Sequence, residues 1–257
     1  GYDRMRNHHP QWAMIMYFPQ DTPVELGPTG ILPGTQNYES RTFEGNEPAG
    51  EVLASGEAGT FALIHYDIWH RSTPNVLGQP RFMLKFEFMR TEMPQSPSWN
   101  NHERQWRKPE GLQLPIGEHD RMWEETWNWL FGQVGSIANT ANTLATHPVE
   151  RIKELAAELR SFEPSAINAA YELAASGQGG VDALLEALRG EDKQASRTAA
   201  YGLSVAGSDA VKGLLATISN EEAEPSAEII ARAVFALGEL RGLASEAIPA
   251  LVNLMQH

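Results

Sequence analysis

Residues 65–75 read HYDIWHRSTPN, from His65 to Asn75, and Arg81 follows eleven residues after His70. An imidazole can offer a neutral nitrogen to a divalent transition metal. A guanidinium can grip a carboxylate through two parallel hydrogen bonds. An imidazole on one strand and a guanidinium at the start of the next can therefore hold a metal ion and a dicarboxylate on one face of a small barrel.

The first 93 residues have the pattern of a β domain. Apolar runs rich in β-branched and aromatic residues are separated by Pro and Gly, and these runs span 13–18, 30–32, 60–64 and 82–88. The last run alternates, which places Lys85 and Glu87 on one face and apolar side chains on the other, namely Phe82, Leu84, Phe86 and Phe88. Several short strands with such turns predict a sandwich or a partial jelly roll over residues 1–93.

Residues 94–147 are interpreted as a connector that contains one helix. The segment 119–133 carries Trp123, Trp127 and Leu130 at helical spacing. We expect this helix to lie across the outside of the barrel, and an aromatic cage for a ligand is the alternative.

Residues 148–257 change to a helical period and repeat themselves. The sequence AAYEL at 169–173 is echoed by AAYGL at 199–203 and AVFAL at 233–237, and a second apolar helix follows each, at 181–188, 211–218 and 247–254. Helix pairs that recur in this way must stack to bury their apolar faces, which predicts an α-solenoid that resembles HEAT-type repeats. A helical bundle without repeat symmetry is the alternative.

The composition narrows the possible functions. The 257 residues contain no cysteine, so any metal must be bound by His, Asp or Glu. The formal charge of −13 argues against a nucleic-acid partner, because phosphate binding requires clustered Lys and Arg. No apolar run reaches the length of a membrane span and no leader opens the chain, so we expect no membrane association and take the cytoplasm as the default location.

Three segments resemble a known family. The first is MYFPQD at 16–21, which runs into GPTGILPGTQ at 27–36, with Gln36 where a His is common. The second is the run 56–70, and the third is the set His70, Ser72, Asn75 and Arg81, at the spacing of an H-x-S…N…R motif. Residues 14–81 thereby resemble the phytanoyl-CoA dioxygenase family of Fe(II)- and 2-oxoglutarate-dependent oxygenases, which implies a double-stranded β-helix.

The resemblance implies specific roles. His70 would be one iron ligand, and Arg81 and Ser72 would bind the far carboxylate of 2-oxoglutarate, while the substrate would be a small organic molecule. The family completes its iron site with an H-x-D pair on an earlier strand, and we expect that pair to lie before Gly1. His8 and His9 are interpreted as solvent-facing or supporting groups.

A local H-x-D is also present. His65 and Asp67 share one face if this segment is a strand, with His70 at the end of the same strand, so a triad would require a sharp bend. We interpret His65 and Asp67 as polar strand residues near the mouth of the site. Arg71 directly follows His70 and should point away from it.

The sequence leaves three functions open. The first is a 2-oxoglutarate-dependent dioxygenase whose solenoid binds a protein partner. The second is a non-catalytic HEAT-repeat interaction protein that carries a degenerate jelly roll. The third is a cupin-like metalloenzyme without 2-oxoglutarate, which would leave Arg81 unexplained.

Overall fold

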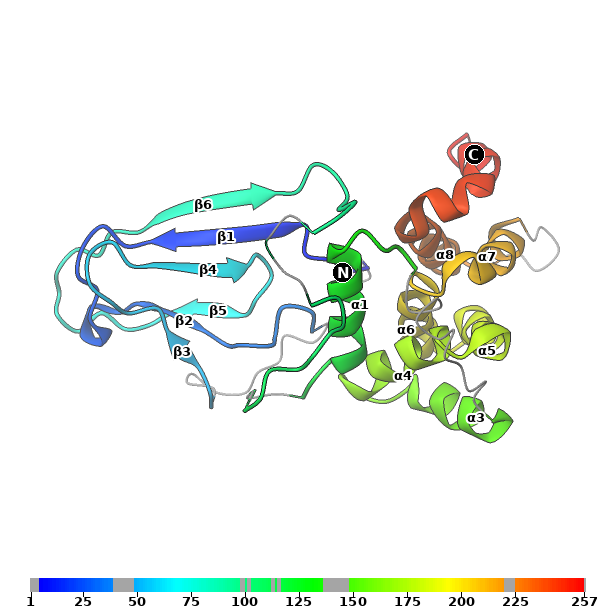
Figure 1. The fold of residues 1–257 in the computed structure, drawn as a ribbon, viewed down its shortest axis with the longest axis horizontal. Helices are drawn as coiled ribbons and strands as arrows, with labels where there is room; N and C mark the ends of the chain where they lie inside the picture. The colour runs from blue at the N-terminus through cyan, green and yellow to red at the C-terminus, as the bar shows by residue number, and fades with distance from the viewer. Residues whose placement is uncertain are drawn as a thin grey trace. The chain divides into compact units, whose positions relative to one another are not determined.

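The computed structural model describes residues 5–38, 49–97, 100, 103–111, 114, 117–135, 148–219 and 225–256 (Figure 1). The predicted connector residues 136–147 therefore lie outside the described part. The chain divides into two compact units. The β unit contains residues 6–93 and 108–118, and the helical unit contains Met5, Pro94–Arg107 and the described residues from His119 onward.

The β unit consists of two small antiparallel sheets. In the first, β1 (Trp12–Tyr17) lies between β4 (Phe61–His65) and β6 (Leu84–Met89). In the second, β2 (Thr29–Ile31) lies between β3 (Val52–Leu53) and β5 (His70–Ser72). A single 3-10 turn, η1 (Val24–Leu26), precedes β2. Both sheets contribute side chains to one apolar core, which contains Met14, Met16, Phe18, Ile31 and Ile64.

The register of β6 decides which of its faces looks inward. Lys85 is paired with Met16 and Glu87 with Met14, and side chains of paired residues lie on the same face of a sheet. Because both methionines are buried in the core, Lys85 and Glu87 are on the inner side. The apolar residues of β6, such as Phe86, are on the outer side, where Leu84, Phe86 and Phe88 are about half exposed.

The described elements of the helical unit are α-helices and two 3-10 segments. Its elements are α1 (Asp120–Leu130), α3 (Val149–Glu158), α4 (Ser165–Ala174), α5 (Gly177–Arg189), α6 (Lys193–Leu203), η3 (Gly207–Ala210), α7 (Val211–Ile218), α8 (Ala227–Leu240), η4 (Arg241–Ala247) and α9 (Ile248–Leu254). α1 packs against α4, and its Met122 is buried in the helical core. The sequence did not predict that contact. None of the described helices is long and apolar enough to cross a membrane.

The three repeated sequence segments lie within α4, α6 and α8. Tyr171 and Tyr201 are both fully buried, and Phe235 meets Tyr201 edge to face with ring centroids 5.8 Å apart. α6 contacts both α4 and α8, so these helices form one continuous layer. Gly202 allows the close approach, because a Cβ there would lie 2.6 Å from the carbonyl oxygen of Ala170.

Two of the helices begin at a residue that suits the position. The Asp192 carboxylate accepts a hydrogen bond from the backbone N–H of Ala195 at the start of α6 (2.9 Å). The Ser226 hydroxyl accepts one from Ile229 at the start of α8 (3.3 Å). Each side chain satisfies a backbone donor that has no partner inside its helix.

Candidate functional site

The strand β5 divides three consecutive side chains between two faces of its sheet. His70 is paired with Ile31 and Ser72 with Thr29, while Arg71 is paired with Gly30. Because Ile31 belongs to the core between the sheets, His70 and Ser72 are on the inner side of β5. Arg71 is on the outer side, as its sequence position predicted.

The backbone before His70 is held by one buried hydroxyl. Thr35 Oγ1 accepts a hydrogen bond from the Trp69 backbone N–H (2.8 Å) and donates one to the Leu32 carbonyl oxygen (2.7 Å). Leu32 N–H donates in turn to the Trp69 carbonyl (3.0 Å). The Pro33-Gly34-Thr35 turn therefore ties the end of β2 to the residue before His70, and Gly34 supplies the positive φ of 85° that this turn requires.

The ring of His70 has a defined tautomer. Its Nδ1 lies 2.8 Å from the carbonyl oxygen of Ile68, and a carbonyl can only accept a hydrogen bond. In the neutral ring, Nδ1 therefore carries the proton and Nε2 is the nitrogen with the lone pair. A hydrogen bond from one ring nitrogen to a backbone carbonyl is the usual support for a His whose other nitrogen binds a metal.

Arg81 presents a buried donor that lacks an acceptor. Its Nη1 is buried and has no hydrogen-bond partner among the residues that the structure describes. Thr29 Oγ1 donates to Met83 Sδ (3.9 Å), which links the inner side of β2, beside Ser72, to the segment that carries Arg81. An unpaired buried guanidinium nitrogen is costly unless an acceptor binds it, and a carboxylate is its best partner.

The turn between Ser72 and Arg81 is held at both ends. Asn75 Nδ2 donates to the Gln79 carbonyl (2.8 Å), and Asn75 Oδ1 accepts from Gly78 N–H (3.2 Å), so the Asn75 side chain caps this turn. Gly27 lies against it with a φ of 74°, and a Cβ at Gly27 would be 2.7 Å from the Thr73 carbonyl oxygen.

The prediction that His65, Asp67 and His70 share one strand is wrong. β4 ends at His65 and pairs with β1, whereas β5 begins at His70 and pairs with β2, so the chain turns between them and changes sheet. Asp67 forms an ion pair with Arg6 (3.5 Å), and its backbone N–H donates to His65 Nδ1 (3.0 Å). Burial lowers the pKa of His65.

His8 and His9 are buried, so the interpretation that they face solvent is wrong. His9 N–H donates to Asn7 Oδ1 (3.0 Å), which holds the backbone of this segment in a local turn. In the described part of the chain, no three His, Asp or Glu side chains lie close enough together to bind a metal ion. The described residues therefore do not form a complete iron site.

A pocket of about 350 Å³ opens beside His70. It is lined by Met14, Tyr66, Asp67, Ile68, Trp69, His70, Lys85 and Glu87. Sequence reasoning did not select Lys85 and Glu87 as site residues. The sequence pattern that could have pointed to Lys85 and Glu87 is the alternation in residues 82–88. This alternation indicates that the strand has two faces, but it does not indicate which face lines the core.

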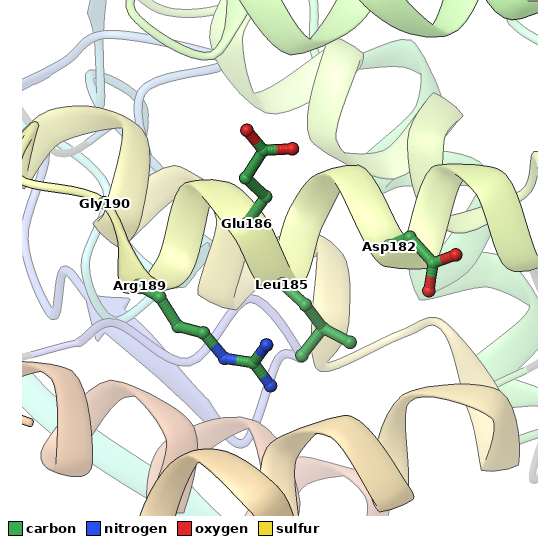
Figure 2. A pocket seen from close by; sticks show the side chains of 5 residues that line it. All are labelled: Asp182, Leu185, Glu186, Arg189 and Gly190. Atoms are coloured by element: carbon green, nitrogen blue, oxygen red, sulfur yellow. The ribbon is translucent and has the colours of Figure 1, made fainter. Parts of the chain in front are cut away.

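A second pocket, of about 450 Å³, lies along α5 in the helical unit (Figure 2). Glu186 and Arg189 leave the helix on different sides. The guanidinium of Arg189 donates to Thr217 Oγ1 (2.9 Å) and to the Gly213 carbonyl (2.8 Å), so it joins α5 to α7 and is already occupied. This pocket carries no group arranged for catalysis.

A protein-family model matches most of the β unit. Residues 2–83 match the family model described as Phytanoyl-CoA dioxygenase (PhyH), which covers 82 of the 257 residues. This part of the chain is therefore similar to a family of Fe(II)- and 2-oxoglutarate-dependent oxygenases. No curated protein and no solved structure matches the chain.

Proposed function

We propose that the β unit is the cosubstrate-binding part of a non-haem Fe(II)- and 2-oxoglutarate-dependent dioxygenase that hydroxylates a small organic substrate. The observation that carries this proposal is Arg81, whose buried Nη1 lacks an acceptor among the described residues. A double-stranded β-helix fits the two facing antiparallel sheets and their shared core.

Each proposed residue has a distinct task. Arg81 would bind the far carboxylate of 2-oxoglutarate with its planar fork, and Ser72 would donate its hydroxyl to the same carboxylate. His70 would direct Nε2 to the iron, since Ile68 holds Nδ1. Two further ligands, a His and a carboxylate, would come from outside the described residues. Bound iron and 2-oxoglutarate supply the oxidising power in this family, and the protein positions the target C–H bond.

Equilibrium binding of 2-oxoglutarate tests the proposal. Titration calorimetry should show Arg81→Ala weakening the affinity by about tenfold to a hundredfold, with Arg81→Lys between it and the wild type. The matched control is Arg107→Ala, because Arg107 is highly exposed and only forms a surface pair with Glu103. Equal affinities for the wild type and Arg81→Ala would refute the proposed role.

A non-catalytic interaction protein with a degenerate jelly roll is the second candidate. Its support is the missing group of three metal donors in the described part. Measuring the release of succinate from 2-oxoglutarate distinguishes the two functions. An oxygenase with a complete set of iron ligands releases succinate, and His70→Ala abolishes that release. An interaction protein releases no succinate. Cytoplasmic location remains the default for both.

The helical unit is proposed to be a short HEAT-like array that binds a protein. Support comes from the equivalent buried positions of Tyr171 and Tyr201 in neighbouring first helices and the packing of α6 between α4 and α8. Second helices such as α5 and α7 would supply the binding face. Cross-linking should then recover a partner whose capture is unaffected by His70→Ala and abolished by charge reversal at Asp182 and Glu186, which are on α5.

A further inference from the structure

The inner face of β6 brings two opposite charges to the pocket beside His70. Lys85 and Glu87 are two residues apart on one strand, and both are on the side of the buried methionines Met14 and Met16. Two residues of an extended strand span about 7 Å, so the side chains of Lys85 and Glu87 can converge on one small molecule. The strand has its apolar residues outside and its charges inside, the reverse of what burial alone would select.

Neither charge is neutralised by the described part of the protein. The side chains of Lys85 and Glu87 form no hydrogen bond or ion pair with any residue that the structure describes, nor with each other. The other acidic group of the pocket, Asp67, is already paired with Arg6. The remaining walls are largely apolar or aromatic, with Tyr66, Ile68 and Trp69 among them.

We propose that Lys85 and Glu87 select a zwitterionic substrate, a free amino acid or a molecule like one. Lys85 would bind its carboxylate, and Glu87 would bind its ammonium group. This inference deepens the proposed function and rests on it, because the pocket holds the substrate only if His70 marks the reaction centre. The volume of about 350 Å³ suits a molecule of that size.

Arg81 and Lys85 have different tasks in this proposal. Arg81 has a buried, unpaired nitrogen and a planar fork, which suits the cosubstrate carboxylate. Lys85 is an exposed, flexible point charge on the pocket wall, which suits a substrate that must enter and leave. The pocket contains His70 and Lys85 together, so a molecule bound by Lys85 lies next to the proposed iron ligand.

The test uses the twenty common amino acids with two derivatives of each. The methyl ester removes the carboxylate charge, and the N-acetyl form removes the ammonium charge. Saturation-transfer NMR identifies the members that bind the wild type, and titration calorimetry measures their affinities for Lys85→Met and Glu87→Gln. The control variant carries Glu150→Gln and Lys153→Met, two exposed residues of α3, which belongs to the helical unit.

The expected pattern is crossed. Lys85→Met should weaken binding of the amino acid and of its N-acetyl form by about tenfold and leave binding of the methyl ester unchanged. Glu87→Gln should weaken binding of the amino acid and of its methyl ester by about tenfold and leave binding of the N-acetyl form unchanged. A variant that had lost its fold would bind neither the N-acetyl form nor the methyl ester, and the test would then rest on the other variant.

Three results would overturn the inference. One is that no amino acid binds the wild type, and another is that both variants bind every ligand as the control does. The third is that Lys85→Met weakens 2-oxoglutarate as much as Arg81→Ala, which would make Lys85 a cosubstrate ligand. If 2-oxoglutarate fails to bind the wild type while the crossed pattern holds, the amino-acid site stands and the proposed oxygenase function falls.

Discussion

Arg71 donates two hydrogen bonds of 2.7 Å to Glu51, one from Nε to Oε1 and one from Nη2 to Oε2. This bidentate pair lies on the side of β5 opposite to His70. Gly30 makes room for it, because a Cβ there would be 2.1 Å from Glu51 Oε1. Arg71 is therefore satisfied inside the fold, whereas Arg81 Nη1 has no acceptor among the residues that the structure describes.

Removing this pair should change stability without changing cosubstrate binding. Both side chains are largely buried, at 22% and 9% exposure, so loss of one leaves the other charge uncompensated. We expect Arg71→Ala to lower the free energy of unfolding by about 1–3 kcal/mol in urea titrations. Its affinity for 2-oxoglutarate should equal that of the wild type. A large loss of that affinity would assign the carboxylate to Arg71 instead of Arg81.

Thr35 offers a second test, of the hydroxyl that holds the backbone before His70. Thr35→Val keeps the shape and removes both hydrogen bonds, to Trp69 and Leu32, at a buried position. The expected loss of stability is about 1–3 kcal/mol, measured by chemical denaturation. Thr35→Ser keeps the hydroxyl and should recover most of the loss. If Thr35→Ser were as unstable as Thr35→Val, loss of the methyl group would cost as much as loss of the hydroxyl, and the two hydrogen bonds would not be the main contribution of Thr35.

Two glycines of the helical unit should respond in opposite directions to the same substitution. Gly202→Ala would place a Cβ 2.6 Å from the Ala170 carbonyl oxygen and push α6 from α4, at a cost of about 1–3 kcal/mol. Gly238 lies in α8, and a Cβ there would meet nothing within 4 Å. Gly238→Ala should therefore raise stability by about 0.5–1 kcal/mol. Equal effects in thermal unfolding would contradict the close packing of α4 and α6.

Acid should destabilise the helical unit through His119. Burial lowers the pKa of His119 to about 4 from its usual 6.5, so the unfolded chain binds the proton more readily than the folded one. The stabilising effect is complete above pH 6.5 and is lost as the pH falls from about 6.5 to about 4, for a total of about 3 kcal/mol. In His119→Leu, the free energy of unfolding in urea should no longer fall between pH 6.5 and pH 4 through this residue. An unchanged fall would mean that other groups cause it.

Several elements could be predicted because their patterns are local. The apolar run 211–218 coincides with α7, and the run 13–18 differs by one residue at each end from β1. Helical period and β alternation depend on side chains close in sequence, so both patterns can be recognised without knowledge of tertiary contacts. The contact of α1 with α4 is different: the spacing of Trp123 and Trp127 indicates a helix but does not name its partner.

The sequence indicates candidate site residues but not the geometry around them. His70 and Arg81 stand out by type and spacing, yet a three-residue strand such as β5 is too short to show a period. The residues from His65 to His70 therefore suggest a single strand in the sequence, whereas the structure has a sharp turn there. Alternation in β6 separated Lys85 from Phe86, but only the pairing with Met16 showed which face lines the pocket.

Carbon-13 NMR of 2-oxoglutarate labelled at the C5 carboxylate tests the central claim most directly, because it observes the group that Arg81 is proposed to bind. On addition of the wild-type protein, we predict a shifted and broadened C5 signal. The signal should return to the position of the free acid in Arg81→Ala and remain shifted in Arg107→Ala. A C5 signal that the wild type leaves unchanged, or that Arg81→Ala shifts equally, would contradict the account.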